Sequence, residues 1–158
     1  MHIINHISPD MQRRLAEESL KTGQIILVFC EYITSDHPKF YVIINVDPLV
    51  LMIINSGISN YIREKDYLKI LQVKLSEHYE FLLKDSYVNC SKLIYCISKN
   101  DLIGQIIEKP DYYGVKGELI EQDKQEILET ICNATTLDRI QKDLIFKGLS
   151  NEETETTT

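Results

Sequence analysis

Five short apolar segments between residues 24 and 98 constrain the fold more than any other feature of this sequence. They are QIILVFCEYI (24–33), KFYVIINV (39–46), PLVLMIINS (48–56), KILQVKLS (69–76) and SYVNCSKLIYCIS (86–98). Each is rich in β-branched or aromatic residues and is bounded by turn-forming residues, which is typical of β-strands. Because only the Asp47-Pro48 turn separates the second segment from the third, we expect a tight hairpin there. The alternation in 69–76 predicts a half-buried strand, and 86–98 reads as two strand pieces that meet near Ser91.

A helix is predicted before the strands. Ser8 can cap it, Pro9 suits its first turn and Gly23 follows its last periodic residue. Its apolar stripe is thin and consists of Met11, Leu15 and Leu20. We therefore expect this helix to lie against the body as an appendage.

Two more helices are predicted after the strands. Residues 121–134 carry acidic side chains in the first turn, and residues 135–148 have Thr135 or Thr136 as a cap and Gly148 as the end. Their apolar residues recur at helical spacing and are Ile127, Leu128, Ile131, Leu137, Ile140, Leu144 and Ile145. Ordinary packing in a core or a dimer interface explains this spacing, although the acidic character would also suit a mimic of nucleic acid or a grip on a basic partner.

Strands in succession followed by terminal helices predict the α+β class. Short antiparallel strands in such an order hide their edges by closing, so we expect a small antiparallel barrel. The predicted organisation is a helical extension (1–22), a barrel body (23–117) with a connector near its end (108–119), a helical arm (118–149) and a disordered tail without hydrophobic residues (150–158).

Length and composition favour one domain in the cytoplasm. The chain has 158 residues, of which 44% are hydrophobic, and no apolar run approaches the ~18 residues of a membrane span. The N-terminus has neither a basic region nor a continuous apolar run, so we expect no signal peptide and no membrane contact. The four cysteines and four histidines are dispersed, which predicts reduced thiols and neither a metal site nor a cofactor.

The net charge of −7 argues against a protein that simply coats nucleic acid. The acidity is concentrated, however, because residues 118–158 contribute −6 while residues 20–117 are neutral. A neutral body can still carry a local basic site.

The stretch KDSYVNCSKL (84–93) places hydroxyl, amide and lysine side chains where a buried strand is expected. With a period of two, Tyr87, Asn89 and Ser91 share one face of the strand, and Lys92 ends the row. Such side chains can stack a base or bind base edges and phosphate oxygens. A sharp corner of the barrel, in which Asn89 satisfies loose backbone groups, is the alternative interpretation.

The segment 59–69 interleaves aromatic and basic residues, as sites for single-stranded RNA do. Tyr61, Arg63 and Lys65 are therefore candidate RNA contacts, and a solvated helix face is the alternative. A third hypothesis joins Cys90 with His78 and Asp85 as a thiolate nucleophile, its base and an orienting carboxylate.

The order of GQIILVF, HPKFYVIIN, LMIINSGIS and LQVKLSEHYEFLLKDSYVNCSKL, followed by a terminal helix, resembles the PemK/MazF-like plasmid-maintenance toxins. The resemblance spans residues 23–149, and its specific parts are residues 52–59 and 85–93. It implies an SH3-like barrel and a sequence-preferring, metal-independent endoribonuclease. It further implies a homodimer that a cognate antitoxin, encoded by a neighbouring gene, inhibits by filling the RNA groove.

Such toxins drive the ribose 2′-hydroxyl at the adjacent phosphorus, which requires a cation and a group that moves a proton. An arginine precedes a proline ahead of their second strand, and a threonine or serine follows the third. By resemblance, Lys39 takes the arginine position, Ser56 supplies the hydroxyl and Ser86 matches the serine that opens the later strand. Lys39-Phe40 departs from the arginine-proline pair, and an ammonium lacks the planar fork of a guanidinium. From its residues alone, Lys39 can equally be a lysine beside a hairpin loop.

Two functions follow from these residues. The first is an endoribonuclease toxin or defence effector that acts on single-stranded RNA. The second is a catalytically inactive barrel that serves as a protein-interaction module of a toxin–antitoxin or phage-defence system.

Overall fold

The five apolar segments each contribute one strand, and residues 114–118 add a sixth, to one antiparallel sheet in the computed structural model, which describes residues 7–34 and 36–150. The strands are β1 (Gln24–Val28), β2 (Lys39–Asn45), β3 (Val50–Asn55), β4 (Gln72–Lys74), β5 (Tyr87–Asn89) and β6 (Gly114–Glu118). Their order across the sheet is β4-β5-β3-β2-β1-β6. The α+β class is confirmed. The sheet is open, with β4 and β6 at its edges, so closure into a barrel is not confirmed.

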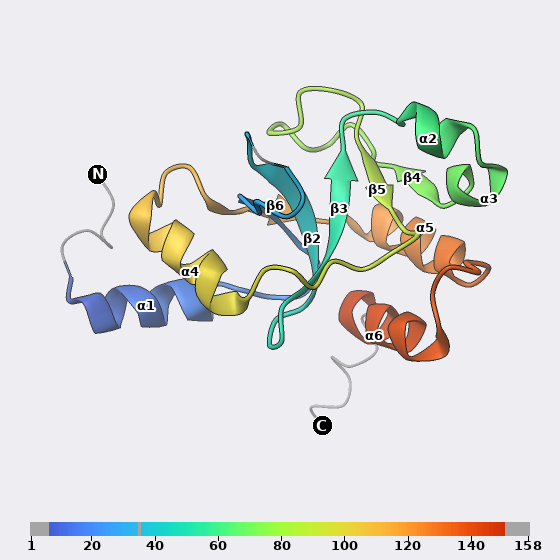
Figure 1. The fold of residues 1–158 in the computed structure, drawn as a ribbon. Coiled ribbons are helices and arrows are strands. Elements are labelled where there is room, and N and C mark those ends of the chain that lie inside the picture. The colour runs from blue at the N-terminus through green and yellow to red at the C-terminus, as the bar shows by residue number, and fades with distance from the viewer. Residues whose placement is uncertain (1–6, 35, 151–158) are drawn as a thin grey trace.

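Helices cover both faces of the sheet (Figure 1). The helices of the described chain are α1 (Pro9–Glu18), α2 (Asn60–Arg63), α3 (Asp66–Lys69), α4 (Lys99–Glu108), α5 (Glu121–Ile131) and α6 (Arg139–Leu149). In Figure 1, α1 and α4 lie side by side against one face, and α5 and α6 lie on the other. The central strands are therefore sandwiched between two helix pairs.

The two faces of the sheet belong to two separate hydrophobic cores. Ile44 of β2 and Ile54 of β3 belong to the α5/α6 core, while Tyr41 and Ile53 belong to the α1/α4 core. Neighbouring residues of a strand point to opposite faces, so a strand that is buried on both sides must be apolar at every position. This explains the uninterrupted apolar runs of β1 and β3.

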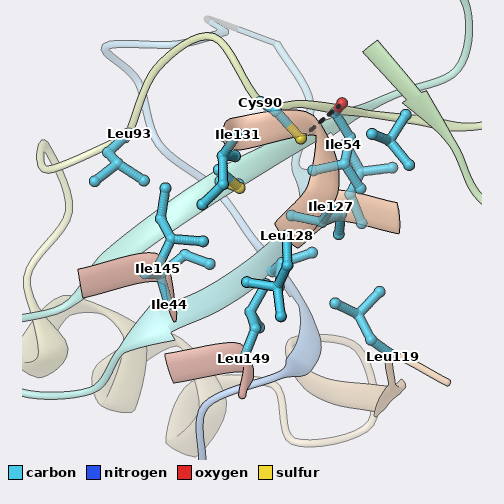
Figure 2. Packing of buried hydrophobic residues seen from close by; sticks show 14 of the residues in the cluster. Ile44, Ile54, Cys90, Leu93, Leu119, Ile127, Leu128, Ile131, Ile145 and Leu149 are labelled. Carbon is cyan, nitrogen blue, oxygen red and sulfur yellow. Dashed lines mark hydrogen bonds between the residues drawn. The ribbon is translucent and has the colours of Figure 1, made fainter. Parts of the chain in front are cut away.

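Side chains of α5 and α6 point at the sheet in the α5/α6 core. Figure 2 shows Ile127 and Ile131 of α5 and Ile145 of α6 directed toward Ile44 and Ile54. The backbone of α6 also lies against β2, since a Cβ atom at Gly148 would overlap the carbonyl oxygen of Ile44. Gly148 therefore lies within the last turn of α6 and allows the helix to approach β2 closely. The prediction that Gly148 ends the helix was wrong.

A buried carboxylate anchors α5 to the loop after β4. Asp123 is only 1% exposed, and its Oδ2 accepts hydrogen bonds from the backbone and hydroxyl of Ser76 and from the Tyr79 hydroxyl at 2.6 Å. The Tyr79 hydroxyl in turn accepts from the backbone N–H of Ile120. A buried charge is tolerated when several donors meet it, so this network fixes the start of α5.

On the opposite face, α4 is tied to the end of β1 by one side chain. The Gln105 amide donates to the Phe29 carbonyl and accepts from the Phe29 N–H, both at 2.8 Å. The side-chain amide of Gln105 thus satisfies backbone groups just after β1, beyond the last residue of β1 that pairs with β6.

Several expectations about the elements were wrong. The sequence predicts a connector over 108–119, but this segment contains β6, because Gly114 at positive φ lets the chain turn and pair with β1. Helix α4 was missed, although Ser98 and Asp101 form a capping box at its start. Asp138, and not Thr135 or Thr136, caps α6.

Other expectations concerned burial and length. Of the predicted stripe before the strands, Leu20 is buried as expected, but Met11 and Leu15 are exposed and Ala16 is buried in addition. Ile140 lies outside the core at 79% exposure. Strand β4 covers only three residues of 69–76. The hairpin of β2 and β3 and the break near Ser91 agree with the structure, because Ile94 returns to β3 through a bridge to Leu51. The tail predicted for 150–158 lies outside the described residues, apart from Ser150.

Gly148→Ala should destabilise the protein by about 1–3 kcal/mol, because the added methyl group meets backbone that cannot move aside without separating α6 from β2. Gly104→Ala is a matched control, since Gly104 lies within α4 and has open space around its Cα. Urea unfolding should show this control equal to or more stable than the wild type. Equal stability of Gly148→Ala and the wild type would contradict the packing described for α6.

Candidate functional site

A cleft of about 490 Å³ opens where β2 begins and β3 ends. The antiparallel hairpin places these two strand ends side by side, with Phe40 opposite Ile54. The side chains along the cleft include six polar ones, which are Lys39, Asn55, Ser56, Ser59, Asn89 and Lys92. We call this hollow the polar cleft.

Lys39 is the half-buried cation of the polar cleft. Its Nζ donates to Oδ1 of Asn55 at 2.6 Å across the hairpin. Burial lowers the pKa of Lys39 below the usual lysine value of 10.5. The Asn55 amide thus fixes the direction of an ammonium group whose proton is held less tightly than usual.

A second hollow, of about 270 Å³, adjoins the polar cleft and shares Lys39 and Ser56 with it. Its apolar lining comes from Pro38, Phe40, Ile54, Phe81, Leu82 and Leu83. The rings of Phe40 and Phe81 lie 5.6 Å apart. We call this hollow the apolar pocket.

An imidazole also lines the apolar pocket. His37 stands two residues before Lys39, and its Nδ1 lies 2.6 Å from Oδ1 of Asp36. A carboxylate at Nδ1 orients the ring and selects which nitrogen carries the proton. His37, Lys39 and Ser56 therefore bring an imidazole, an ammonium and a hydroxyl to one hollow.

Ser86 lines the apolar pocket, but its hydroxyl is engaged. The side chain is buried, and Oγ donates to the carbonyl of Lys84 at 2.9 Å. This bond shapes the turn before β5. In this conformation Ser86 holds the wall of the pocket and does not point a free hydroxyl into it.

Two members of the polar row lie on one face of β5. Tyr87 pairs with Asn55 on one side and with Lys74 on the other, and Asn89 pairs with Gln72. Cross-strand partners share a face, so Tyr87 and Asn89 extend the polar surface from Asn55 toward the β4 edge. Of the two, Asn89 lines the polar cleft.

Asn89 also stabilises the bend after β5. Its Oδ1 accepts hydrogen bonds from Nε2 of Gln72 and from the backbone N–H of Ser91, both at 3.0 Å, and from the Ser91 hydroxyl. The Ser91 carbonyl accepts from the Thr136 hydroxyl. Ser91 is thus buried in a structural network, as the corner interpretation requires, while Lys92 beside it is exposed and reaches the polar cleft.

The aromatic-basic segment 59–69 forms one wall of the polar cleft, but through residues other than Tyr61, Arg63 and Lys65. Ser59 caps α2 by accepting from the N–H of Ile62, and both residues line the cleft. Nζ of Lys65 lies 4.8 Å from the ring centre of Tyr61, and Arg63 donates to the Ile58 carbonyl. Tyr61 and Arg63 stand on α2 and Lys65 lies between α2 and α3, and none of the three is among the lining residues of the cleft in the described chain.

The sequence-based candidates converge in part. Lys39, Ser56, Asn89 and Lys92 meet in the polar cleft, and Ser86 joins Lys39 and Ser56 at the apolar pocket. His37 and Asn55 were not proposed as site residues, although the hairpin register would have placed Asn55 beside Lys39. Phe81 could not have been proposed, because it comes from an irregular loop with no sequence pattern.

The arrangement of Cys90 opposes the thiolate hypothesis. Cys90 is fully buried in the α5/α6 core, and its pKa is raised to about 12, mainly by burial and further by the charge of Glu126. A thiol with such a pKa is protonated at neutral pH and is a poor nucleophile. The buried, protonated thiol of Cys90 is therefore a structural part of the core and not a suitable nucleophile.

Comparisons with known proteins place the chain in no family. No protein-family model matches it, and no curated protein matches it. In the described part of the chain, no three or more His, Cys, Asp and Glu side chains are grouped so as to hold a metal ion. None of the described helices has the length and apolar character that crossing a bilayer requires. The polar cleft and the apolar pocket are therefore the features of this protein that indicate its function.

Lys39 should be acylated at lower pH than an ordinary lysine. Because burial lowers its pKa, the reactive neutral amine forms earlier as the pH rises, and the midpoint of its labelling should lie below 10.5. Trace labelling with acetic anhydride across a pH series, followed by peptide mass spectrometry, measures this midpoint. A midpoint at or above 10.5 would contradict the half-buried position of the side chain.

Cys90 should resist iodoacetamide in the native protein at pH 8, since its thiol is buried and its pKa is about 12. The exposed Cys132 is the internal control and should be modified, and both should react in denaturant. Rapid native modification of Cys90 would revive the thiolate hypothesis.

Proposed function

We propose that this protein is a MazF/PemK-like toxin or defence effector, a metal-independent endoribonuclease that cleaves single-stranded RNA between the polar cleft and the apolar pocket. The observation that carries the proposal is the meeting of His37, Lys39 and Ser56 in one hollow. These side chains offer what cleavage by a ribose hydroxyl needs, which is a proton acceptor, a cation and a hydrogen-bond donor.

The reaction would proceed without a metal or cofactor. The ribose 2′-oxygen attacks the adjacent phosphorus, the bond from phosphorus to the 5′-oxygen breaks, and the products are a 2′,3′-cyclic phosphate and a 5′-hydroxyl. His37 takes the proton of the 2′-hydroxyl. The proton that the leaving 5′-oxygen gains comes from Lys39, whose lowered pKa makes it a better acid than an ordinary lysine.

Lys39 has a second role in this scheme, because its charge offsets the negative charge that builds on the phosphorane oxygens. A lysine lacks the planar fork of the arginine that the resemblance would lead one to expect. The Asn55 amide compensates by holding Nζ in one direction. Ser56 is exposed at the end of β3 and can donate to a phosphate oxygen, while Ser86 positions the pocket wall through its bond to Lys84.

The proposal includes a relationship of the fold to the SH3-like barrel. The antiparallel succession β1-β2-β3 and the position of the site at the β2–β3 strand ends support it. In this relationship the open sheet is a divergent form of the barrel. Helices α1 and α4 cover a face that a closed small barrel would bury by its own curvature.

Homodimerisation and inhibition by a cognate antitoxin, the product of a neighbouring gene, are parts of the same proposal. A segment that fills the polar cleft would block the shared residues Lys39 and Ser56 together. Single-stranded RNA and such a partner would thus compete for one surface.

A second candidate function is a catalytically inactive protein-interaction module. The observation that favours it is the group of exposed apolar side chains on and beside α2 and α3, which are Tyr61, Tyr67 and Ile70. Exposed apolar residues close together are typical of a surface that binds protein. Under this alternative the protein binds its partner but does not cleave RNA.

The decisive test is incubation of the purified protein with single-stranded RNA in EDTA. We expect cleavage products with cyclic phosphate ends, and no cleavage of an RNA with a 2′-deoxyribose at the scissile position. Lys39→Ala and His37→Asn should each lower the rate by about 100-fold or more, because each removes a group that acts in the transition state.

Lys147→Ala is the matched control, since Lys147 is an exposed lysine on α6. Its rate should equal that of the wild type. Intact RNA with the wild-type protein would favour the interaction module, and a rate that Lys39→Ala leaves unchanged would remove Lys39 from the reaction centre.

A further inference from the structure

Two hollows of different character, one mixed and one mainly apolar, meet at the same two side chains. Lys39 and Ser56 line both the polar cleft and the apolar pocket. A phosphate held by these two residues would therefore have one hollow on each side. In an RNA strand, the groups on the two sides of a phosphate are nucleosides.

The polar cleft presents hydrogen-bond donors. Oδ1 of Asn89 is occupied by three donors, and Oδ1 of Asn55 is occupied by Lys39, so each amide has its NH₂ group to offer a ligand. Lys39 and Lys92 can only donate. The Ser59 hydroxyl accepts from Ile62 and keeps its proton to donate.

The polar groups of the cleft are donors, and donors select a ligand with acceptors; the remaining side chains of the lining are the isoleucines Ile33, Ile53, Ile58, Ile62 and Ile94. Among the described residues, no acidic side chain lines the polar cleft. On the edge away from its 2-amino group, guanine presents the two acceptors O6 and N7, and uracil presents O4 where cytosine has an amino group. On the same edges, the amino groups of adenine and cytosine would face another donor. The polar cleft thus favours guanine or uracil.

Apart from the reacting groups His37, Lys39 and Ser56 and the exposed Lys84, the apolar pocket offers a base a surface without such discrimination. Its aromatic rings and aliphatic side chains present area for stacking, and its buried hydroxyl, Ser86, is bonded to the Lys84 carbonyl. Leu83 is 92% exposed at the pocket, a position that a stacked base would cover. Stacking is tolerant of sequence because every base has a flat face.

We infer that the two hollows are unequal base subsites: the polar cleft selects guanine or uracil on one side of the scissile phosphate, and the apolar pocket stacks any base on the other. This inference rests on the proposed function and names the specificity of that site. The protein would then prefer a base on one side of the cleaved bond only.

The test uses fluorescein-labelled 2′-O-methyl tetranucleotides, which cannot be cleaved, with abasic outer positions and each of the two central bases varied in turn. Fluorescence anisotropy gives the affinity. We expect one central position to favour guanine or uracil over adenine or cytosine by about tenfold, and the other to vary by less than about threefold.

Three variants separate the subsites. Leu83→Asp should weaken all sequences by about fivefold or more and leave the base preference intact. Lys92→Glu, which puts an acceptor in place of a donor at an exposed position, should reduce the preference for guanine and uracil. Ile140→Asp is the control, because Ile140 is an exposed apolar residue on α6 and should change neither quantity.

The outcomes distinguish a failure of the proposed base subsites from a failure of the proposed RNA cleavage. Preference at both central positions, preference at neither, or an unchanged affinity of Leu83→Asp would overturn the inference while RNA cleavage in EDTA stands. Binding with the expected one-sided preference supports the inference even if Lys39→Ala shows that cleavage has another origin. Failure of every tetranucleotide to bind, together with intact RNA in EDTA, would overturn both.

Discussion

The burial of β1, β2 and β3 on both faces is the constraint from which the rest of the structure follows. An antiparallel sheet usually leaves one face to water, but here α5 and α6 cover one side and α1 and α4 the other (Figure 1). Each central strand must therefore be apolar at consecutive positions. Because polar side chains are excluded from the middle of these strands, they gather where the strands end.

The candidate site lies at this boundary. Lys39 and Asn55 continue the strand faces that carry Tyr41 and Ile53 in the α1/α4 core, and they meet across the hairpin just beyond it. A cation at the rim of a core is half-desolvated, which lowers its pKa and strengthens its attraction for phosphate. The same packing that stabilises the sheet thus also lowers the pKa of the lysine at the end of the strands.

The strands, the class of the fold and part of the site were predictable from local patterns. The hairpin around Asp47-Pro48 and the break near Ser91 follow from turn residues and alternation, and both are found. Strand β6 was not predictable in this way, because Gly114 and Gly117 weaken its propensity and only its pairing with β1 makes it a strand. The sequence allows Asn89 to stabilise a corner of the chain or to line a groove. In the structure it does both, since Oδ1 of its amide stabilises the bend after β5 and the residue lines the polar cleft.

Lys39 and Ser56 became candidates through the resemblance, whereas local patterns predict five of the described strands, helices on either side of them, and the unusual polarity of the 85–92 stretch. These are properties of neighbours along the chain, and propensity and periodicity report on such neighbours. Long-range packing set the rest: the sheet stays open between two helix pairs, His37 joins Lys39 and Ser56, and Phe81 forms a wall of their pocket. Those facts depend on contacts between distant residues, and such contacts leave no local pattern in a single sequence.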